Sequence, residues 1–215
     1  MSNIKVDYRI LGDVGTNCYL VVNEDNGECI LIDLADCPDK IQQMIEKNNA
    51  ELKAVLLTHG HYDHITAAED IRNMYNINIY ASCDEKELLT DTRMNLSAHS
   101  RKPVTLKADV YHNDGDVYEL AGMTIEIKHT PGHTIGGSCY YIKEAGILFS
   151  GDTLFAESVG RTDFPTGSMS QIVHSIKDKL LDLPDDTKVF PGHGSATNLD
   201  DEKVANPFLR RAIKM

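Results

Sequence analysis

Four side chains that can bind metal ions lie within six residues, directly after the apolar run 54–57. They are His59, His61, Asp63 and His64. The apolar run predicts a buried strand, and the amphipathic pattern from Ile65 to about Tyr75 predicts a helix, so the cluster falls on the turn between them. Neutral imidazoles suit Zn, Fe, Mn or Co, and a carboxylate adds the negative charge that a second cation needs. A polar loop that merely contains several histidines is the alternative for this segment alone.

Three further ligand-type residues follow predicted strands later in the chain. His133 follows residues 123–128, Asp152 follows residues 146–149, and His193 follows residues 187–190. Gly and Pro stand beside each of them and favour tight turns. Loops that gather at one edge of a sheet scaffold commonly build a binding or catalytic site. We therefore expect these three loops to converge on the first cluster.

The composition predicts one soluble domain without a nucleic-acid partner. The chain has 215 residues, of which 41% are hydrophobic, and a formal net charge of -12 with no long basic segment. Phosphate backbones are bound by clustered Lys and Arg, which this chain lacks. The five cysteines are odd in number and form no CxxC pair, so no disulfide framework is expected. The first five residues lack the apolar core of a signal peptide, and no apolar run has membrane-spanning length, which favours a cytoplasmic location.

Turn residues divide the chain into short strands and helices. We expect strands near 4–11, 17–23 and 28–34, a helix after Pro38, a strand at 77–80, a helix from Ser82 and a long loop over 91–103. The spacing of Ser82 and Glu85 predicts a capping box for the helix that begins there. Strands then lead to about Phe149, a loop to Gly167, a helix over 169–181, a further strand and a terminal helix. By themselves these patterns indicate a mixture of α and β structure.

The order and spacing of the ligand-type residues resemble the metallo-β-lactamase superfamily, and within it the glyoxalase II-like (hydroxyacylglutathione hydrolase-like) branch. The resemblance covers nearly the whole chain. It implies an α+β fold, a four-layer αββα sandwich, formed by a single domain over residues 1–215. Members that are specific for glutathione carry a separate C-terminal helical domain, for which the 22 residues after His193 are too few. We therefore expect the single-domain form of this branch.

The resemblance also implies the ligand sets and the reaction. His59, His61 and His133 would bind a first metal, Asp63, His64 and His193 a second, and Asp152 would bridge the two. Zn is the expected ion, and Fe or Mn also suit an all-N and O ligand set. A metal-bridging hydroxide would attack the carbonyl of a small-molecule thioester, an S-2-hydroxyacyl thiol ester in this branch. Asp63 and Asp152 would be the catalytic carboxylates, with Asp63 orienting the hydroxide.

Two residues outside the ligand set have a possible role at the site. Arg161 lies on a Gly-containing loop beyond Asp152, where its guanidinium could clamp a substrate carboxylate or pair with Asp163 to order the loop. Glutathione-specific members tend to have Tyr where Asp163 stands. Asp33 ends a predicted strand at the same edge, and could either accept a hydrogen bond from a ligating His or cap the strand.

Two other functions use the same fold or the same ligands. A persulfide dioxygenase would bind a single iron through the residues that correspond to His59, His133 and Asp152, and it shares a similar tract at residues 160–164. A non-catalytic metal-binding module would hold ions without turnover. The number of metal equivalents and oxygen uptake with a persulfide distinguish these alternatives from the hydrolase.

Overall fold

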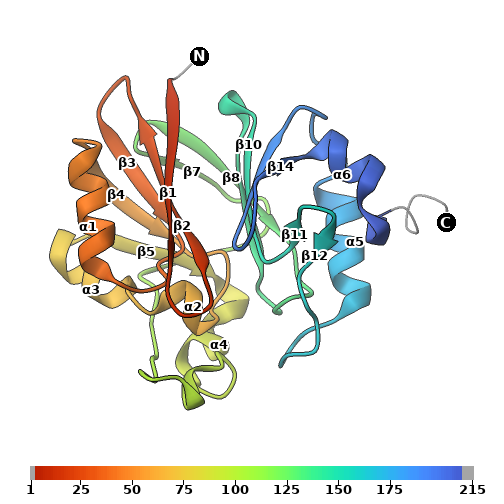
Figure 1. Ribbon diagram of the computed structural model, residues 1–215, viewed down its shortest axis with the longest axis horizontal. Coiled ribbons are helices and arrows are strands. Elements are labelled where there is room, and N and C mark those ends of the chain that lie inside the picture. The colour runs from red at the N-terminus through yellow and green to blue at the C-terminus, as the bar shows by residue number, and fades with distance from the viewer. Residues whose placement is uncertain (1–2, 210–215) are drawn as a thin grey trace.

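Two six-stranded sheets pack face to face, and helices cover the outer face of each (Figure 1). The computed structural model describes residues 3–209, so the predicted domain range of 1–215 extends beyond the described residues at both ends. The layers run helix, sheet, sheet, helix, and the predicted four-layer αββα sandwich is therefore confirmed.

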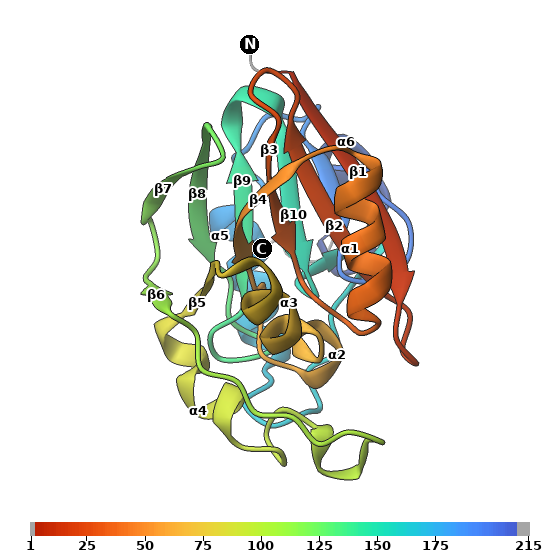
Figure 2. The same ribbon diagram turned by 90° about the vertical axis from the view of Figure 1, so that its left-hand side faces the viewer.

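The first sheet has the strand order β1-β2-β3-β4-β5-β6, antiparallel from β1 to β3 and parallel from β3 to β6. Helices α1 and α3 lie on its outer face, as Figure 2 shows. The short α2 follows β4, and α4 follows a 3-10 turn after β5. The bounds are β1 Ile4–Leu11, β2 Thr16–Asn23, β3 Glu28–Ile32, α1 Pro38–Lys47, β4 Glu51–Leu56, α2 Tyr62–Ile65, α3 Ala68–Tyr75, β5 Asn78–Ser82, α4 Lys86–Thr90 and β6 Val110–His112.

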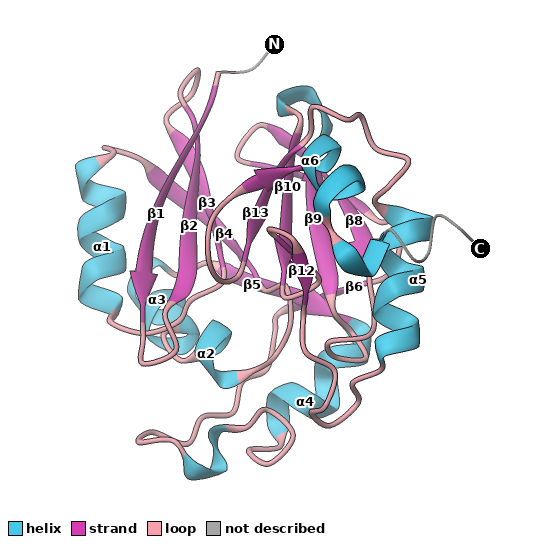
Figure 3. Cartoon of the chain, turned by 45° about the vertical axis from the view of Figure 1, so that its right-hand side comes forward, coloured by secondary structure: helices cyan, strands magenta, loops and turns pink. Residues whose placement is uncertain are grey.

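The second sheet has the order β14-β13-β10-β9-β8-β7, and α5 and α6 cover its outer face (Figure 3). A two-stranded ribbon, β11 with β12, stands beside it. The bounds are β7 Val117–Leu120, β8 Met123–His129, β9 Ser138–Ile142, β10 Ile147–Gly151, β11 Leu154–Phe155, β12 Ser158–Val159, α5 Met169–Lys179, β13 Lys188–Pro191, β14 Thr197–Asn198 and α6 Leu199–Ala205.

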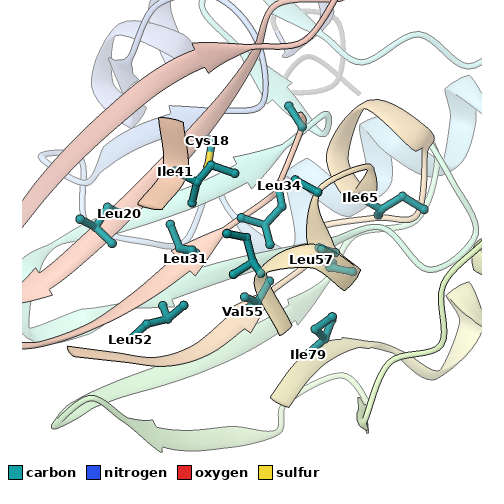
Figure 4. Close-up of a cluster of buried hydrophobic side chains, with 14 of the residues drawn as sticks. Cys18, Leu20, Leu31, Leu34, Ile41, Leu52, Val55, Leu57, Ile65 and Ile79 are labelled. Carbon is teal, nitrogen blue, oxygen red and sulfur yellow. The ribbon is translucent and has the colours of Figure 1, made fainter. Parts of the chain in front are cut away.

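Three apolar cores separate the four layers, because the central strands bury both of their faces. In β2, Leu20 packs with Ile41 of α1, whereas its neighbour Tyr19 packs between the sheets against Phe149. Figure 4 shows Leu20, Ile41 and Val55 together in the core under α1. Successive strand side chains point to opposite faces, and a strand covered on both sides therefore reads as a continuous apolar run. Within residues 3–209, no helix is long and apolar enough to cross a membrane.

The helix predicted from Ile65 to about Tyr75 is interrupted after α2. Leu34, in the loop after β3, donates its N–H to the carbonyl of His64 (2.7 Å) and accepts the N–H of Ala67 (3.1 Å). These two hydrogen bonds replace helical ones, so the helix is interrupted at Thr66 and a new helix, α3, begins at Ala68. The break leaves His64 on a short helix that is fixed to the first sheet.

The helix predicted from Ser82 is present with Ser82 as its N-cap, but it begins as a 3-10 turn and the predicted capping box with Glu85 does not form. A 3-10 turn at Cys83–Glu85 precedes the five-residue α4, and the Ser82 hydroxyl accepts the N–H of Asp84 rather than that of Glu85. The Glu85 carboxylate is buried among other loops and does not return to Ser82. The helix predicted over 169–181 ends at Lys179, and the loop 91–103 contains one 3-10 turn, Ser97–His99.

Candidate metal centre

The strand directions bring the ligand-bearing loops to one edge of the sandwich. β10 runs parallel to β13, and both β8 and β10 are antiparallel to β9, so β8, β10 and β13 end at the same edge of the second sheet. The loops after these strands carry His133, Asp152 and His193. The parallel strands β3 and β4 likewise end together in the first sheet, where Asp33 and the 59–64 segment follow. The seven residues predicted as ligands therefore meet between the two sheets.

His59, His61 and His133 form one group that could hold a metal ion, called here the first ligand set. Their ligand-type nitrogens lie within 4.8 Å of one another, and all three side chains are buried. Nδ1 of His61 is 2.9 Å from Nε2 of His133. Three imidazoles that converge in this way match the protein ligands of a tetrahedral zinc site with one open position.

Asp63, His64 and His193 form a second group that could hold a metal ion, the second ligand set. Asp63 Oδ2 is 3.3 Å from His193 Nε2 and 3.5 Å from His64 Nε2, and the two imidazole Nε2 atoms are 3.4 Å apart. The adjacent residues Asp63 and His64 reach a common point because both lie on the single turn of α2. This grouping agrees with the second ligand set that the sequence predicted.

Asp152 lies between the two sets and directs its oxygens to different partners. Oδ2 is 3.5 Å from Nε2 of both His133 and His193, and Oδ1 is 3.5 Å from Nε2 of His64. A Cβ atom on Gly192 would lie 2.3 Å from Oδ1, so a side chain at that position would occupy the space beside the carboxylate. The carboxylate thus has the position of a bridging ligand.

The hydrogen bonds of the imidazoles fix which nitrogen is free. His64 Nδ1 donates to Asp33 Oδ2 (2.8 Å), and His133 Nδ1 donates to the carbonyl of Arg161 (2.7 Å). The Thr58 hydroxyl donates to Asp33 and accepts from His59 Nδ1 at 3.1 Å. When such a ring is neutral, its proton stays on the hydrogen-bonded Nδ1, and Nε2 can then direct its lone pair into the cluster.

Buried polar atoms without hydrogen-bond partners indicate that these residues could bind a metal ion. Nε2 of His59 and Oδ1 of Asp152 are fully buried, and neither has a hydrogen-bond partner among residues 3–209. A buried polar atom without a partner is costly, so such atoms in a group of ligand types indicate a bound ion. The donors are all nitrogen and oxygen, a set that suits Zn, Fe or Mn.

Burial keeps His59 and His61 neutral. It lowers the pKa of His59 well below the ordinary value, and the neighbouring histidines lower it further. Burial and the nearby His133 lower the pKa of His61 to about 3. Both imidazoles therefore hold a free lone pair at neutral pH, as metal ligands must.

The second set lies in a field of negative charge. Burial acts to lower the pKa of His64, but Asp33, Asp63 and Asp152 outweigh it and raise the value to about 10. Burial acts to raise the pKa of Asp63, but His64 and His193 outweigh it and hold the value below the usual range. Positive charge is thus favoured at this position, whether a proton or a metal ion supplies it.

Asp33 has the supporting role that its position suggested. Its side chain is buried and accepts the N–H of Thr58 (2.8 Å), the Thr58 hydroxyl (2.8 Å) and His64 Nδ1 (2.8 Å). It adopts a positive φ of 55°, which Asp tolerates better than most residues. One carboxylate therefore orients a histidine of each ligand set, His64 directly and His59 through Thr58.

Two further supports were not evident from the sequence. Asn17 donates its N–H to Gly192 (2.7 Å) and its amide to the carbonyls of Pro191 (2.9 Å) and Gly194 (3.0 Å), and so holds the His193 loop. Thr16 donates its hydroxyl to Asp63 Oδ2 (3.0 Å). Both residues begin β2, distant in sequence from the loops that they hold. A Thr-Asn pair at the start of a strand is too common to reveal such a role.

Arg161 contributes a backbone and a side-chain contact. Its carbonyl orients His133, as described above, and its guanidinium forms two hydrogen bonds with Asp163 (2.8 and 2.7 Å). The guanidinium also lies 3.9 Å from the centre of the Phe164 ring, which in turn contacts the rings of His61 and His133. The side chain is therefore close to the ligand cluster while remaining 59% exposed.

A cleft of about 300 Å³ opens beside Asp63. Gly12 and Asp13 of the β1–β2 turn line one side, and residues 99–102 line another. Of the proposed ligands, Asp63 lines this cleft.

Comparison with known proteins places the chain in a family. The family profile described as the metallo-beta-lactamase superfamily matches residues 11–193. Probable metallo-hydrolase YqgX of Bacillus subtilis (strain 168) is 37% identical over 202 residues, which cover 93% of this chain and 94% of that protein. Hydroxyacylglutathione hydrolase GloC of Haemophilus influenzae is 35% identical over 196 residues, covering 90% of this chain and 92% of its own.

Solved structures agree with the sequence comparison. The crystal structure of BLEG-1 B3 metallo-beta-lactamase has a TM-score of 0.90 and 34% identity, and the match covers 95% of this chain and 99% of that chain. The structure of TTHA1623 in a di-iron-bound form has a TM-score of 0.83 and 31% identity, with 94% and 100% covered. With its αββα sandwich and its cluster of His and Asp ligands, the chain belongs to the metallo-beta-lactamase superfamily of metallo-hydrolases, with relatives in the glyoxalase II-like branch.

Proposed function

We propose that this protein is a binuclear metal-dependent hydrolase that cleaves thioesters, with S-2-hydroxyacyl thiol esters as the preferred class. The observation that carries the proposal is Asp152, whose carboxylate lies 3.5 Å from histidine nitrogens of both ligand sets. The mononuclear alternative needs only His59, His133 and Asp152, and would leave Asp63, His64 and His193 without an ion to bind. The similarity to a hydroxyacylglutathione hydrolase over most of both chains supports the choice of thioester.

Each residue has a definite part in the proposed reaction. When bound, two divalent ions supply a hydroxide nucleophile at neutral pH and positive charge for the oxyanion and the leaving thiolate. His59, His61 and His133 would hold the first ion and Asp63, His64 and His193 the second, with Asp152 placed to serve both. Asp63, held by Thr16, can also accept a hydrogen bond that orients the nucleophile.

The first test is the number of metal ions together with the substrate class. We expect the purified protein, loaded with Zn²⁺ and analysed for metal content, to bind close to two equivalents. The loaded protein should hydrolyse S-lactoylglutathione or another low-molecular-weight thioester faster than acyl-CoA, lactams or phosphodiesters. Saturation at one equivalent, with oxygen uptake in the presence of a persulfide and iron, would instead identify a persulfide dioxygenase.

A second test concerns Arg161 and the binding of a carboxylate group on the substrate. Its ion pair with Asp163 is exposed on both sides, and such pairs contribute little to stability, so the guanidinium is free to exchange Asp163 for a substrate carboxylate. Arg161→Ala should raise KM for anionic thioesters by roughly tenfold, because one charge-assisted contact with the substrate is lost. KM for neutral thioesters should change less.

Asp163→Asn serves as the matched control for Arg161→Ala. It removes the partner of Arg161 but leaves the guanidinium in place, so KM for anionic thioesters should stay level or fall. Metal content and the midpoint of urea unfolding should be unchanged in both variants. An equal rise in KM for both substrate types in Arg161→Ala would assign Arg161 to loop order alone.

A further inference from the structure

Glu85 is a buried carboxylate that joins two of the ligand-bearing loops. Its side chain is 1% exposed, and it lies at the end of the 3-10 turn that follows β5. Oε2 accepts the N–H of Gly60 at 2.8 Å, and Oε1 accepts the N–H of Gly136 at 2.7 Å. Gly60 stands between His59 and His61, and Gly136 lies three residues after His133.

The two loops are shaped to close on this carboxylate. A Cβ atom on Gly60 would lie 3.0 Å from Glu85 Oε2 and 2.8 Å from a methyl group of Leu88. A Cβ atom on Gly136 would lie 2.6 Å from Cγ of Glu85. Both positions therefore accept only glycine without displacement, and in both the backbone N–H comes within hydrogen-bonding distance of Glu85.

Among the described residues these loops have no strand pairing with each other, and a backbone hydrogen bond from the N–H of Ser138 to the carbonyl of Thr58 (2.9 Å) joins them only at their bases. The 59–61 segment follows β4 of the first sheet, and the 133–136 segment follows β8 of the second. Nδ1 of His61 and Nε2 of His133 nevertheless lie 2.9 Å apart, so the two loops approach closely here. A carboxylate with one oxygen for each loop sets the distance between the two backbones.

We propose that Glu85 is a positioning residue for the ligand set His59, His61 and His133, because it holds the loops of both sheets at the separation that one metal ion requires. The inference rests on the proposed metal centre but not on the choice of thioester substrate. Glu85 acts through the backbone of the loops and touches no reacting group. The second set, Asp63, His64 and His193, is held by Asp33, Thr16 and Asn17 and does not depend on it.

The test is Zn²⁺ binding by the Glu85→Gln variant, measured by competition with a chromophoric chelator. Glutamine has nearly the same shape but presents an NH₂ group to one of the two N–H donors, so one loop loses its anchor. We expect the affinity for one Zn²⁺ equivalent to fall by roughly 10- to 100-fold, the usual effect of removing an outer support of a metal ligand. The affinity for the other equivalent should stay within about threefold of the original value.

Glu202→Gln is the matched control. Glu202 is also 1% exposed and also holds a loop, since it accepts the N–H of Glu157 (2.9 Å) and the hydroxyl of Thr197 (2.8 Å). It belongs to α6 and contacts none of the proposed ligands. Glu202→Gln should lower the midpoint of urea unfolding of the metal-free protein much as Glu85→Gln does, while both Zn²⁺ affinities remain unchanged.

The outcomes distinguish a role of Glu85 in positioning the first ligand set from a role in the stability of the whole fold. Unchanged Zn²⁺ affinities in Glu85→Gln, or an equal fall at both equivalents, would overturn the proposal, and so would the same loss in Glu202→Gln. If Glu85→Gln does not fold, Glu85→Asp is measured by the same criterion, because it keeps the charge but is too short to reach both loops. A protein that binds Zn²⁺ as expected but hydrolyses no thioester would refute the proposed function alone.

Discussion

Replacing Asp152 with alanine should lower the affinity of both metal sites and reduce thioester turnover by on the order of 10⁴-fold or more. Asp152 is the residue whose two oxygens face both ligand sets, Oδ1 towards His64 and Oδ2 towards His133 and His193. Its removal takes a ligand from each ion at once. The acidification of water to a hydroxide near neutral pH depends on those ions, so turnover should fall together with metal content.

The measurement is metal content after dialysis against a weak chelator, followed by steady-state hydrolysis at saturating Zn²⁺. Asp152→Asn retains one oxygen, and we expect it to keep one equivalent more tightly than Asp152→Ala does. Asp182→Asn, a change at an exposed carboxylate on the loop after α5, should resemble the unaltered protein. Two tightly bound equivalents in Asp152→Ala would contradict the bridging assignment.

Replacing Asp63 with alanine should remove one metal equivalent and leave the other. The Asp63 carboxylate lies 3.3 Å from His193 and 3.5 Å from His64, and it is not part of the set formed by His59, His61 and His133. Loss of the second ion and of the oxygen that orients the nucleophile should reduce kcat by roughly 10²- to 10⁴-fold. Metal analysis and kcat of the same preparation check both parts of the prediction.

Thr16→Val is the control for Asp63→Ala. It removes the hydroxyl that donates to Asp63 Oδ2 but keeps the carboxylate itself. The loss of one hydrogen bond to a charged group should cost about tenfold in kcat at most and should leave both metal equivalents bound. Near-normal activity of Asp63→Ala with its metal content established would show that another residue orients the nucleophile.

The layered architecture was predictable in outline because burial of one or both faces of a strand or helix determines how apolar residues are spaced along the sequence. Strands such as β2, buried on both faces, appear as continuous apolar runs, whereas β8 alternates apolar residues such as Met123 with polar ones such as Thr124. The number and order of the elements followed from these runs and from the turns between them. The αββα arrangement itself came from the resemblance of the ligand motif, since propensities indicate only a mixture of α and β.

The errors arose where tertiary hydrogen bonds override local preference. The amphipathic pattern from Ile65 to about Tyr75 indicated one helix, but Leu34, more than 30 residues earlier, takes the hydrogen bonds that would have continued it. Ser82 and Glu85 have the spacing of a capping box, but Glu85 bonds to Gly60 and Gly136. In both cases the competing partner is distant in sequence, so no local pattern contains it.

The chemical types at the candidate metal centre and their order along the chain can be read from the sequence. Few structural roles require three imidazoles and a carboxylate within six residues, and His, Asp and Gly recur at turns after apolar strands. Which atoms those residues present to one another depends on the fold. The free nitrogen of His64 and of His133 depends on Asp33 and on the carbonyl of Arg161, which folding alone brings within 2.8 Å. That of His59 depends on its neighbour Thr58, whose hydroxyl is oriented by the distant Asp33. Hydrogen bonds of this kind require a particular distance and direction in space, and spacing along the chain specifies neither.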